Sequence, residues 1–343
     1  LARGALKPEL IDSLAGHIAT FHAQAPATTD PDFGTPAKVL QPALDNFADM
    51  LPHADSDRRA TLEALADWTR QTFARLEPVF AARHRDGRVR ECHGDLHLRN
   101  IALIDGHPVP FDCIEFSAGF RWTDVINEVA FLVMDLMDRG RPDLGYRFLD
   151  GYLSASGDYA GVAVLRFYLV YRALVRAKIH DLRARQEHAD PEEAERLQTA
   201  ADHYLKLAGD IAHGHKPALI LMHGFSGAGK SRVAAALTEA IGAIRLRSDV
   251  ERKRLFGLDT GARSHSDVDA GIYDREAGAK TYARLVELAR TILRAGYPAI
   301  VDAAFLARWQ RESMYALARA LDQPVRLVDC TASSASLRER VVG

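Results

Sequence analysis

Apolar residues recur at intervals of three and four through most of the N-terminal part of the chain. Leu10, Leu14, Ile18 and Phe21 form one such stripe, and residues 62–76 carry a second. This spacing places apolar side chains on one face of a helix, so it predicts amphipathic helices packed against a core. The same pattern predicts helical structure over most of residues 8–85 and near 122–139, 142–154, 159–186 and 191–212.

A different pattern interrupts the helices between residues 88 and 116. Two short apolar runs, 101–104 and 109–111, flank Asp105 and Gly106. An Asp-Gly pair between apolar runs is a strong signal for a β-hairpin, because both residues accept the left-handed backbone of a tight turn. We therefore predict a small hairpin inside an otherwise helical domain.

The C-terminal part of the chain alternates short apolar runs with helical segments. The runs and segments are 218–222, 230–241, 267–295, 299–301, 307–321 and 325–329. Such alternation is typical of βαβ units, which build a parallel sheet. Residues 213–217 read His-Gly-His-Lys-Pro, a run of helix breakers. We predict two domains: residues 1–213, mainly α-helical with the small hairpin, and residues 214–343, an α/β domain with a parallel sheet.

With 343 residues, 48% of them hydrophobic and 26% charged, the chain has the composition of a globular protein of two domains. Lysine plus arginine number 44 and aspartate plus glutamate 46, so the net charge of -2 attracts neither nucleic acid nor anionic lipid. The most apolar stretch, 129–137, is short for a membrane span and contains Asp135. Cys92, Cys113 and Cys330 lie far apart, which indicates small buried hydrophobes in a reducing compartment. We expect a cytoplasmic protein that does not act at a membrane.

A Gly-rich string opens the second domain: residues 224–231 read Gly-Phe-Ser-Gly-Ala-Gly-Lys-Ser, the complete pattern G-x-x-x-x-G-K-[ST]. An apolar run precedes it and a helical segment follows, the order that a phosphate-binding loop requires, although such strings also occur in ordinary turns. Loop N–H groups and the start of the next helix attract a polyphosphate. Lys230 is expected to reach the β- and γ-phosphates and Ser231 to ligate Mg²⁺. The predicted nucleotide-binding residues are Gly224, Phe225, Ser226, Gly227, Ala228, Gly229, Lys230, Ser231 and Arg232.

Another motif lies beside the predicted hairpin. His93, Asp95 and Asn100 form an H-x-D-x-x-x-x-N string, and Asp112 follows Asn100 by twelve residues. Phosphoryl transfer to a hydroxyl needs such a set, because one carboxylate accepts the hydroxyl proton while an amide oxygen and a second carboxylate hold Mg²⁺. Asp and Asn also bond to the backbone in ordinary turns, which is the alternative interpretation.

This segment resembles the catalytic loop of the aminoglycoside phosphotransferase family, kinases of the protein-kinase-like fold whose motif runs H-G-D-x-H-x-x-N. The resemblance implies that Asp95 is the catalytic base, that Asn100 and Asp112 ligate the metal and that His93 holds the loop. His97 also falls on the motif. The resemblance assigns His97 no chemical role, and a packed, hydrogen-bonded histidine is an equally good interpretation.

Two further features bear on that resemblance. Asp124 resembles the family's aspartate that ties down the catalytic loop, and a helix N-cap explains it equally well. The family also has an N-terminal lobe with a strand lysine and a partner glutamate that grip the α- and β-phosphates. Nothing before residue 90 has that pattern. We therefore expect the first domain to be a kinase C-lobe and the chain to be a piece of a longer protein.

Acidic residues at two strand ends complete the second candidate site. Residues 244–249 read as a short strand ending in Asp249, and the S-D-x-x-R string formed with Arg252 resembles small-molecule and polynucleotide 5′-hydroxyl kinases. That resemblance makes Asp249 a candidate catalytic group for the acceptor hydroxyl, with a helix N-cap as the alternative. Residues 299–302 have the form of a Walker B strand, whose Asp302 reaches the Mg²⁺ shell.

Arg308 and Arg311 follow this strand as candidates for holding acceptor or phosphate, although helix arginines are usually solvated. The chain ends about where related kinases begin an arginine-bearing lid, so we expect a truncated lid. Half by half, the chain resembles bifunctional aminoglycoside phosphotransferase/ATP-binding proteins, in which a kinase C-lobe is joined to a P-loop kinase of the polynucleotide-kinase and zeta-toxin type.

The sequence therefore predicts an ATP- and Mg²⁺-dependent phosphotransferase that acts on a hydroxyl of a small-molecule acceptor. Asp95 would be the base at the first site, and Lys230 with Ser231 would hold nucleotide at a second. The alternative is a nucleotide-gated module, in which the P-loop half hydrolyses ATP slowly and the first half is a scaffold. Phosphorylation of nucleic-acid ends is a third interpretation, which the net charge and the scarcity of basic-aromatic clusters disfavour.

Overall fold

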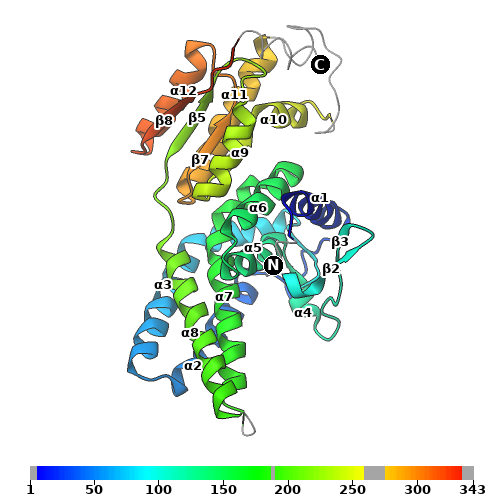
Figure 1. The fold of residues 1–343 in the computed structure, drawn as a ribbon, viewed down its shortest axis with the longest axis vertical. Coiled ribbons are helices and arrows are strands. Elements are labelled where there is room, and N and C mark those ends of the chain that lie inside the picture. Colours follow the sequence, from blue (N-terminus) through cyan, green and yellow to red (C-terminus); the bar gives the residue numbers. More distant parts are fainter. Residues whose placement is uncertain (1–5, 187–189, 259–274, 334–343) are drawn as a thin grey trace. The chain divides into compact units, whose positions relative to one another are not determined.

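The computed structural model describes residues 6–186, 190–258 and 275–333 (Figure 1). The chain forms two compact units. The first consists of residues 1–145 and 161–214, and the second of residues 146–160 and 215–343. Residues 146–160 therefore belong to the second unit, although the residues on both sides of them belong to the first.

Helices form the body of the first unit. The long helices α7 (Val162–Ala184) and α8 (Pro191–His213) pack along one another, and α5 (Val125–Asp138) packs on α7 (Figure 1). α5 is central, because every residue from Val125 to Leu136 is buried. The helices expected in these regions are confirmed. The other helical elements are α1 (Pro8–Gln24), α2 (Pro36–Met50), η1 (Leu51–His53), α3 (Ser56–Arg85), η2 (Leu98–Asn100) and α4 (Ala118–Arg121).

The apolar stripe of α1 faces the core as predicted over most of its length. Leu14 and Ile18 are buried in the interior of the unit. The last member of the stripe, Phe21, is 36% exposed. It lines a cavity together with His17 and Pro26, and because the last turn of α1 borders this cavity, the stripe stops being fully buried there.

Two short antiparallel strand pairs complete the first unit. β1 (Val89–Glu91) pairs with β4 (Trp122–Asp124), and β2 (Ile101–Ile104) pairs with β3 (His107–Pro110). The second pair is the predicted hairpin. Its turn residues Asp105 and Gly106 have φ angles of 49° and 79°, the left-handed backbone that a two-residue hairpin turn requires.

A four-stranded sheet forms the centre of the second unit. Its strand order is β6-β7-β5-β8, and every pair of neighbours is parallel, which confirms the predicted sheet. The inner strands are buried as continuous runs, as expected for a parallel sheet covered on both faces. The strands are β5 (Leu219–His223), β6 (Ile244–Arg247), β7 (Ala299–Asp302) and β8 (Val325–Asp329).

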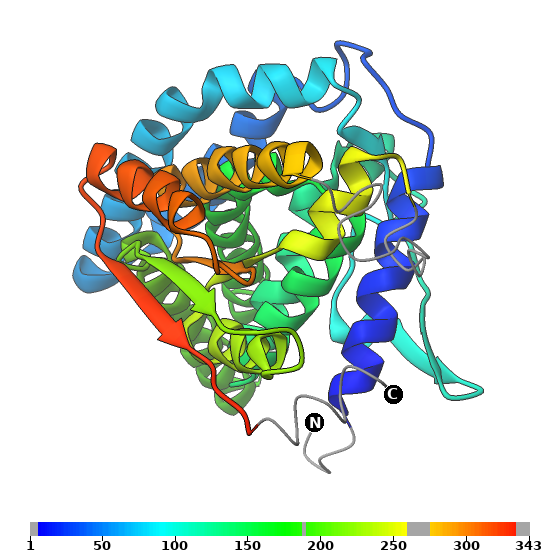
Figure 2. The same cartoon turned by 90° about the horizontal axis from the view of Figure 1, so that it is seen from above.

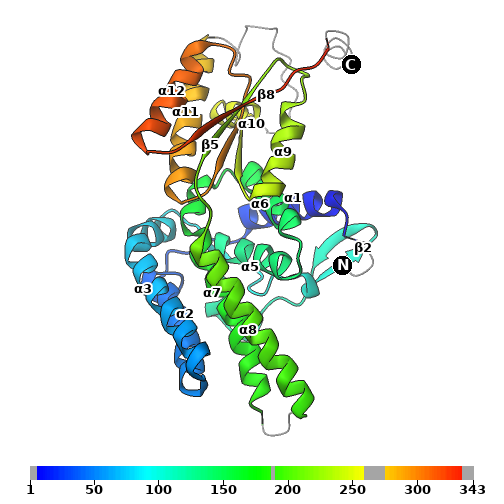
Figure 3. The same cartoon turned by 60° about the vertical axis from the view of Figure 1, so that its left-hand side comes forward.

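Helices cover both faces of this sheet. α9 (Lys230–Ile241) lies on one face, and α11 (Arg275–Arg294) and α12 (Arg308–Ala320) lie on the other (Figures 2 and 3). α10 (Ser248–Leu255) follows β6 and packs on α11. The helix predicted over residues 267–295 is thus present from Arg275 onward, and its first residues lie outside the described part of the chain.

The second unit also contains most of α6 (Pro142–Ser156), followed by η3 (Tyr159–Gly161). Polar contacts join α6 to the P-loop part of the unit. Arg147 donates to Glu239 of α9 at 2.7 Å, and Arg254 of α10 donates to the carbonyl of Ser154 at 2.6 Å. Nothing in the sequence pattern indicates that a helix so far before the P-loop becomes part of this unit.

The cysteines are only partly as expected. Cys92 is buried and Cys330 is half-buried, but Cys113 is exposed, because the open segment just after Asp112 carries it. Within the described ranges, no helix has both the length and the apolar composition that crossing a bilayer demands.

Candidate functional site

Backbone hydrogen bonds join the two segments that carry the first motif. The N–H of Phe111 donates to the carbonyl of Asn100 at 2.9 Å, and the N–H of Ile114 donates to the carbonyl of His93 at 3.0 Å. The ring of His93 is bonded through Nε2 to the carbonyl of Phe111 at 2.8 Å. Asp112 therefore follows directly on a residue that is bonded to both ends of the H-x-D-x-x-x-x-N loop.

Asp95 is held by its neighbours but remains accessible. The side-chain amide of Asn100 donates to the backbone carbonyl of Asp95 at 3.1 Å and to the carboxylate oxygen Oδ2 of Asp95 at 3.0 Å. His97 Nε2 lies 3.3 Å from the same Oδ2. The side chain of Asp95 is 38% exposed. Burial pushes the pKa of Asp95 upward, but His97, Arg172 and Asn100 together hold that pKa below its ordinary value. Asp95 is thus a carboxylate at neutral pH and can accept a proton.

Asn100 and Asp112 fit the proposed metal-binding role. Asn100 is buried, and because its NH₂ group faces Asp95, its amide oxygen is the remaining atom that can bind a cation. Asp112 is exposed and has a φ of 61°, a left-handed conformation that is uncommon outside glycine and concentrates at functional sites. An amide oxygen and a carboxylate are ligands that suit Mg²⁺.

A buried acidic residue is bonded to the backbone of the loop that carries Asp95. Glu128 of α5 accepts from the Gly94 N–H at 2.7 Å through Oε2 and is paired through Oε1 with His22 Nε2 at 2.9 Å. Burial raises the pKa of Glu128, but His22 and the Gly94 N–H outweigh this effect and lower it overall. Glu128 is therefore an ionised anchor for the residue next to Asp95.

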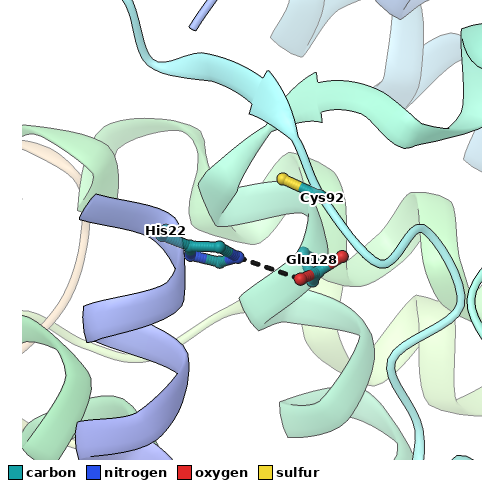
Figure 4. A group of neighbouring side chains, drawn as sticks. All are labelled: His22, Cys92 and Glu128. Atoms are coloured by element: carbon teal, nitrogen blue, oxygen red, sulfur yellow. Dashed lines mark hydrogen bonds and ion pairs between the residues drawn. The ribbon is translucent and has the colours of Figure 1, made fainter. Parts of the chain in front are cut away.

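Figure 4 shows His22 and Glu128 pointing toward one another, with Cys92 beside them. Their donor atoms lie within 4.8 Å of one another, a set that could bind a metal ion. Each group already has a partner, however, since the thiol of Cys92 donates to the carbonyl of Thr123 at 3.7 Å. Burial also raises the pKa of Cys92 well above its usual value, so the thiol is neutral. The cluster is a structural support for the loop.

The structure resolves the two interpretations of Asp124. Its carboxylate accepts from the N–H of Ile126 at 2.9 Å and so caps α5, and it forms a two-bond ion pair with Arg83 of α3 at 2.6 and 2.8 Å. The helix N-cap is thus what Asp124 provides. Glu128, one helical turn later, contacts the loop of Asp95 directly through the Gly94 N–H. The signal for Glu128 was an acidic residue inside an apolar helix, which sequence reasoning did not use.

In the Gly-rich loop after β5, three glycines have positive φ angles, which residues with a Cβ rarely adopt. Gly224, Gly227 and Gly229 have φ angles of 134°, 79° and 89°. A Cβ on Gly224 would lie 2.3 Å from the carbonyl oxygen of Cys330, whereas one on Gly229 would meet open space. α9 begins at Lys230, so the first N–H groups of this helix face the loop with no acceptor inside the helix.

The predicted lysine and Mg²⁺-binding residues come together around this loop. Lys230 Nζ donates to the carbonyls of Gly224 and Phe225 at 2.9 and 2.8 Å. Asp302 lies buried at the end of β7, next to β5. Burial raises the pKa of Asp302, against the effect of Ser231 and nearby arginines. A hydroxyl in the first turn of α9 and a carboxylate at the end of β7 fit a Mg²⁺ ion.

The structure shows the partners of the predicted residues Asp249 and Arg252. Asp249 is paired with Arg247 at 3.0 Å in the first turn of α10. The helix already begins at Ser248, so Asp249 is not its N-cap. Arg252 donates to Thr281 at 3.4 Å.

The two arginines of α12 are bound within their own neighbourhood. Arg308 is 87% exposed and pairs with Glu312 at 2.7 Å, a solvated pair one helical turn apart. Arg311 donates to the carbonyls of Phe305 and Leu306 just before α12. The contacts of both arginines are thus with α12 and with the residues that lead into it.

Two segments of the chain match known families. Residues 2–168 match the Phosphotransferase enzyme family, and residues 219–343 match an AAA domain. A segment that matches the phosphotransferase family thus precedes a segment that matches an AAA domain, which confirms the combination that the two motifs suggested.

Mycobacterial proteins are similar to this chain. Uncharacterized proteins of Mycobacterium tuberculosis and Mycobacterium bovis are 33% identical over 341 residues, which is 97% of this chain and 66% of theirs. The chain therefore spans 66% of the length of these relatives. A Plasmodium vivax ethanolamine kinase has a partial structural likeness, with a TM-score of 0.35 and 13% identity over 57% of this chain and 59% of that one.

Proposed function

We propose that the protein is an ATP- and Mg²⁺-dependent phosphotransferase that moves the γ-phosphoryl group to a hydroxyl of a small molecule. The observation that carries this proposal is the state of Asp95. It is ionised, accessible and fixed by Asn100 and His97 on a loop that is bonded to the segment of Asp112. Positioning and charge neutralisation are what phosphoryl transfer asks of a protein.

In this mechanism the hydroxyl oxygen of the acceptor bonds to the γ-phosphorus while the bond from that phosphorus to the ADP oxygen breaks. Asp95 accepts the proton that the hydroxyl loses. Asn100 and Asp112 would hold Mg²⁺, which neutralises charge on the phosphates. The buried Glu128 fixes the Gly94 N–H and so keeps Asp95 in place during the reaction.

The P-loop of the second unit is proposed as a separate nucleotide site. Lys230 and the amides of residues 224–232 would bind the phosphates, and Ser231 with Asp302 would bind Mg²⁺. Asp249 would act on an acceptor hydroxyl there. Arg252, Arg308 and Arg311 are proposed acceptor contacts, although each of them is bonded to a residue of the protein in this structure.

The proposed setting is the cytoplasm and the proposed partner is a small metabolite. Cys92, Cys113 and Cys330 are all free, which suits a reducing compartment. The formal net charge of -2 gives no general attraction for nucleic acid, so a small hydroxyl compound is the favoured acceptor.

Incubation of the full chain with γ-labelled ATP, Mg²⁺ and a fractionated pool of small hydroxyl compounds tests the proposal. Label should appear in an organic acceptor. Asp95→Asn should reduce that transfer by about 10²- to 10⁴-fold, because the proton acceptor is lost, while Asp105→Asn in the hairpin turn serves as the control. Label found only in inorganic phosphate would overturn the transferase proposal and favour a nucleotide-hydrolysing switch.

A further inference from the structure

One arginine of the second unit is shared between α6 and the P-loop. Arg245 lies on β6 with a side chain that is 11% exposed. Its guanidinium donates to both carboxylate oxygens of Asp150 in α6, at 3.2 and 2.6 Å. The third nitrogen, Nη1, donates to the carbonyl of Ser231 at 3.1 Å and lies 3.9 Å from Asp302. This guanidinium therefore adjoins both residues proposed to bind Mg²⁺.

A cation at this position opposes Mg²⁺ binding. Arginine and a divalent ion both bind carboxylates, so a guanidinium that turned fully toward Asp302 would compete with the metal for it. Burial lowers the pKa of Arg245, but Asp150 more than offsets this and the pKa is raised overall, so Arg245 stays charged. The competition can be relieved only by holding the guanidinium elsewhere.

Asp150 provides that restraint. It accepts two hydrogen bonds from Arg245, at 3.2 and 2.6 Å, whereas Asp302 lies 3.9 Å from the guanidinium, at the limit of ion-pair distance. Among the described residues, other charged groups near Asp302 include Lys230, which is bonded to loop carbonyls, and the paired residues Arg247 and Asp249. Asp150 differs from the partners of Lys230 and Arg247 because it comes from a segment distant in sequence.

We propose that Asp150 positions Arg245 away from Asp302 and thereby keeps the Walker B carboxylate available to Mg²⁺. The inference rests on the proposed P-loop nucleotide site and adds Asp150 to it as a positioning residue. Asp150 contacts neither nucleotide nor metal in this arrangement, and it acts through Arg245. α6 thus contributes a charge that the P-loop segment itself does not supply.

Binding of a fluorescent ATP analogue, measured with and without Mg²⁺, tests the role of Asp150. Asp150→Asn keeps the shape of the side chain but releases Arg245 toward Asp302. The apparent Mg²⁺ dissociation constant should rise about five- to tenfold. Binding of the analogue in EDTA should not weaken, because loss of a negative charge near the loop does not disfavour an anion.

The double variant Asp150→Asn/Arg245→Gln separates positioning from mere support. Removing the competing charge should return the Mg²⁺ dissociation constant to within about twofold of wild type. If Asp150 only supported α6, the second substitution would leave the defect or deepen it. Arg245→Gln alone should bind Mg²⁺ at least as tightly as wild type. This variant tests whether Arg245 opposes Mg²⁺ binding even if Asp150→Asn fails to fold, and weaker Mg²⁺ binding would contradict the inference.

Glu239→Gln is the matched control, since it removes another ion pair between α6 and the P-loop part, 2.7 Å long, without involving Asp302. It should leave the Mg²⁺ dependence unchanged. An equal shift in this variant, or no recovery in the double variant, would overturn the inference. If the wild type shows Mg²⁺-dependent nucleotide binding and Asp150→Asn has the same Mg²⁺ dissociation constant, the role of Asp150 is refuted and the P-loop site is retained. Absence of Mg²⁺-dependent binding in the wild type refutes the P-loop site and the inference together.

Discussion

At the first candidate site, hydrogen bonds from neighbouring side chains fix the position of the proposed base. At the second, the conformation of the loop backbone shapes the proposed phosphate site. Asp95 is bound by Asn100 and His97, and the loop behind it is fixed by buried Glu128. At the P-loop, the conformations of three glycines and the start of α9 shape the site, and Lys230 is bonded to the carbonyls of its own loop.

This difference determines how each site responds to substitution. Buried ion pairs support both the fold and the catalytic loop of the first unit, so changes there should affect stability and activity together. The P-loop groups lie at the surface end of a parallel sheet, and their removal leaves the buried strands intact. Changes there should affect ligand binding with little change in the free energy of unfolding.

The largest effect expected at the second site is the loss of the P-loop lysine, and it separates these two responses. Lys230→Ala removes a cation from the phosphate position and should weaken ATP binding at the P-loop by about 10- to 150-fold. Equilibrium dialysis measures the affinity and the number of ATP molecules bound per chain. The free energy of unfolding without nucleotide should change little, as it should for the exposed control Lys206→Ala. Unchanged ATP affinity would remove the P-loop assignment.

A substitution at Glu128 tests the opposite behaviour of the first unit. Glu128→Gln leaves His22 without its ionised partner in a fully buried position, so unfolding in urea should become easier by about 3 kcal/mol. Phosphoryl transfer should fall as well, because the Gly94 N–H loses its charged acceptor.

The control for Glu128→Gln is an exposed ion pair in the same unit. Asp210→Asn removes the partner of Lys206 on the surface of α8 and should change stability by less than about 0.5 kcal/mol. Equal effects of the two substitutions would show that Glu128 does not anchor the loop. A loss of stability without any loss of transfer would likewise separate Glu128 from the site.

The parts of the fold that the sequence predicts correctly are those with local causes. The hairpin follows from Asp105-Gly106, which the turn uses in the left-handed conformation. The parallel sheet follows from short apolar runs between helical patterns, and the P-loop follows from glycines placed between a strand and a helix. Each signal lies within a few residues of the structure that it specifies.

The interactions that sequence reasoning missed join residues far apart in the chain. His22 and Glu128 are separated by 106 positions, and Asp150 and Arg245 by 95. No spacing rule connects such pairs, because tertiary packing alone brings them together. Asp124 shows the same limit, since the residue before a helix fits both a cap and a loop tie until Arg83 and Ile126 are seen as its partners.

The smallest expected effect concerns the proton affinity of Asp95. His97 contributes the largest of the interactions that lower the pKa of Asp95, through its hydrogen bond and its charge. His97→Leu should therefore raise this pKa. Because the base works only as a carboxylate, activity in the wild type is lost as pH falls through the lowered pKa, and the variant should lose it at a higher pH.

The measurement is the acid limb of the pH profile of kcat/KM for both proteins. At alkaline pH, where Asp95 is ionised in each, the two rates should converge, since the proton acceptor itself is intact. Arg99→Gln changes an exposed residue of the same turn and should leave the acid limb in place. An unshifted limb in His97→Leu would mean that another group governs it, and the first site would then owe the ionised state of its base to Arg172 and Asn100.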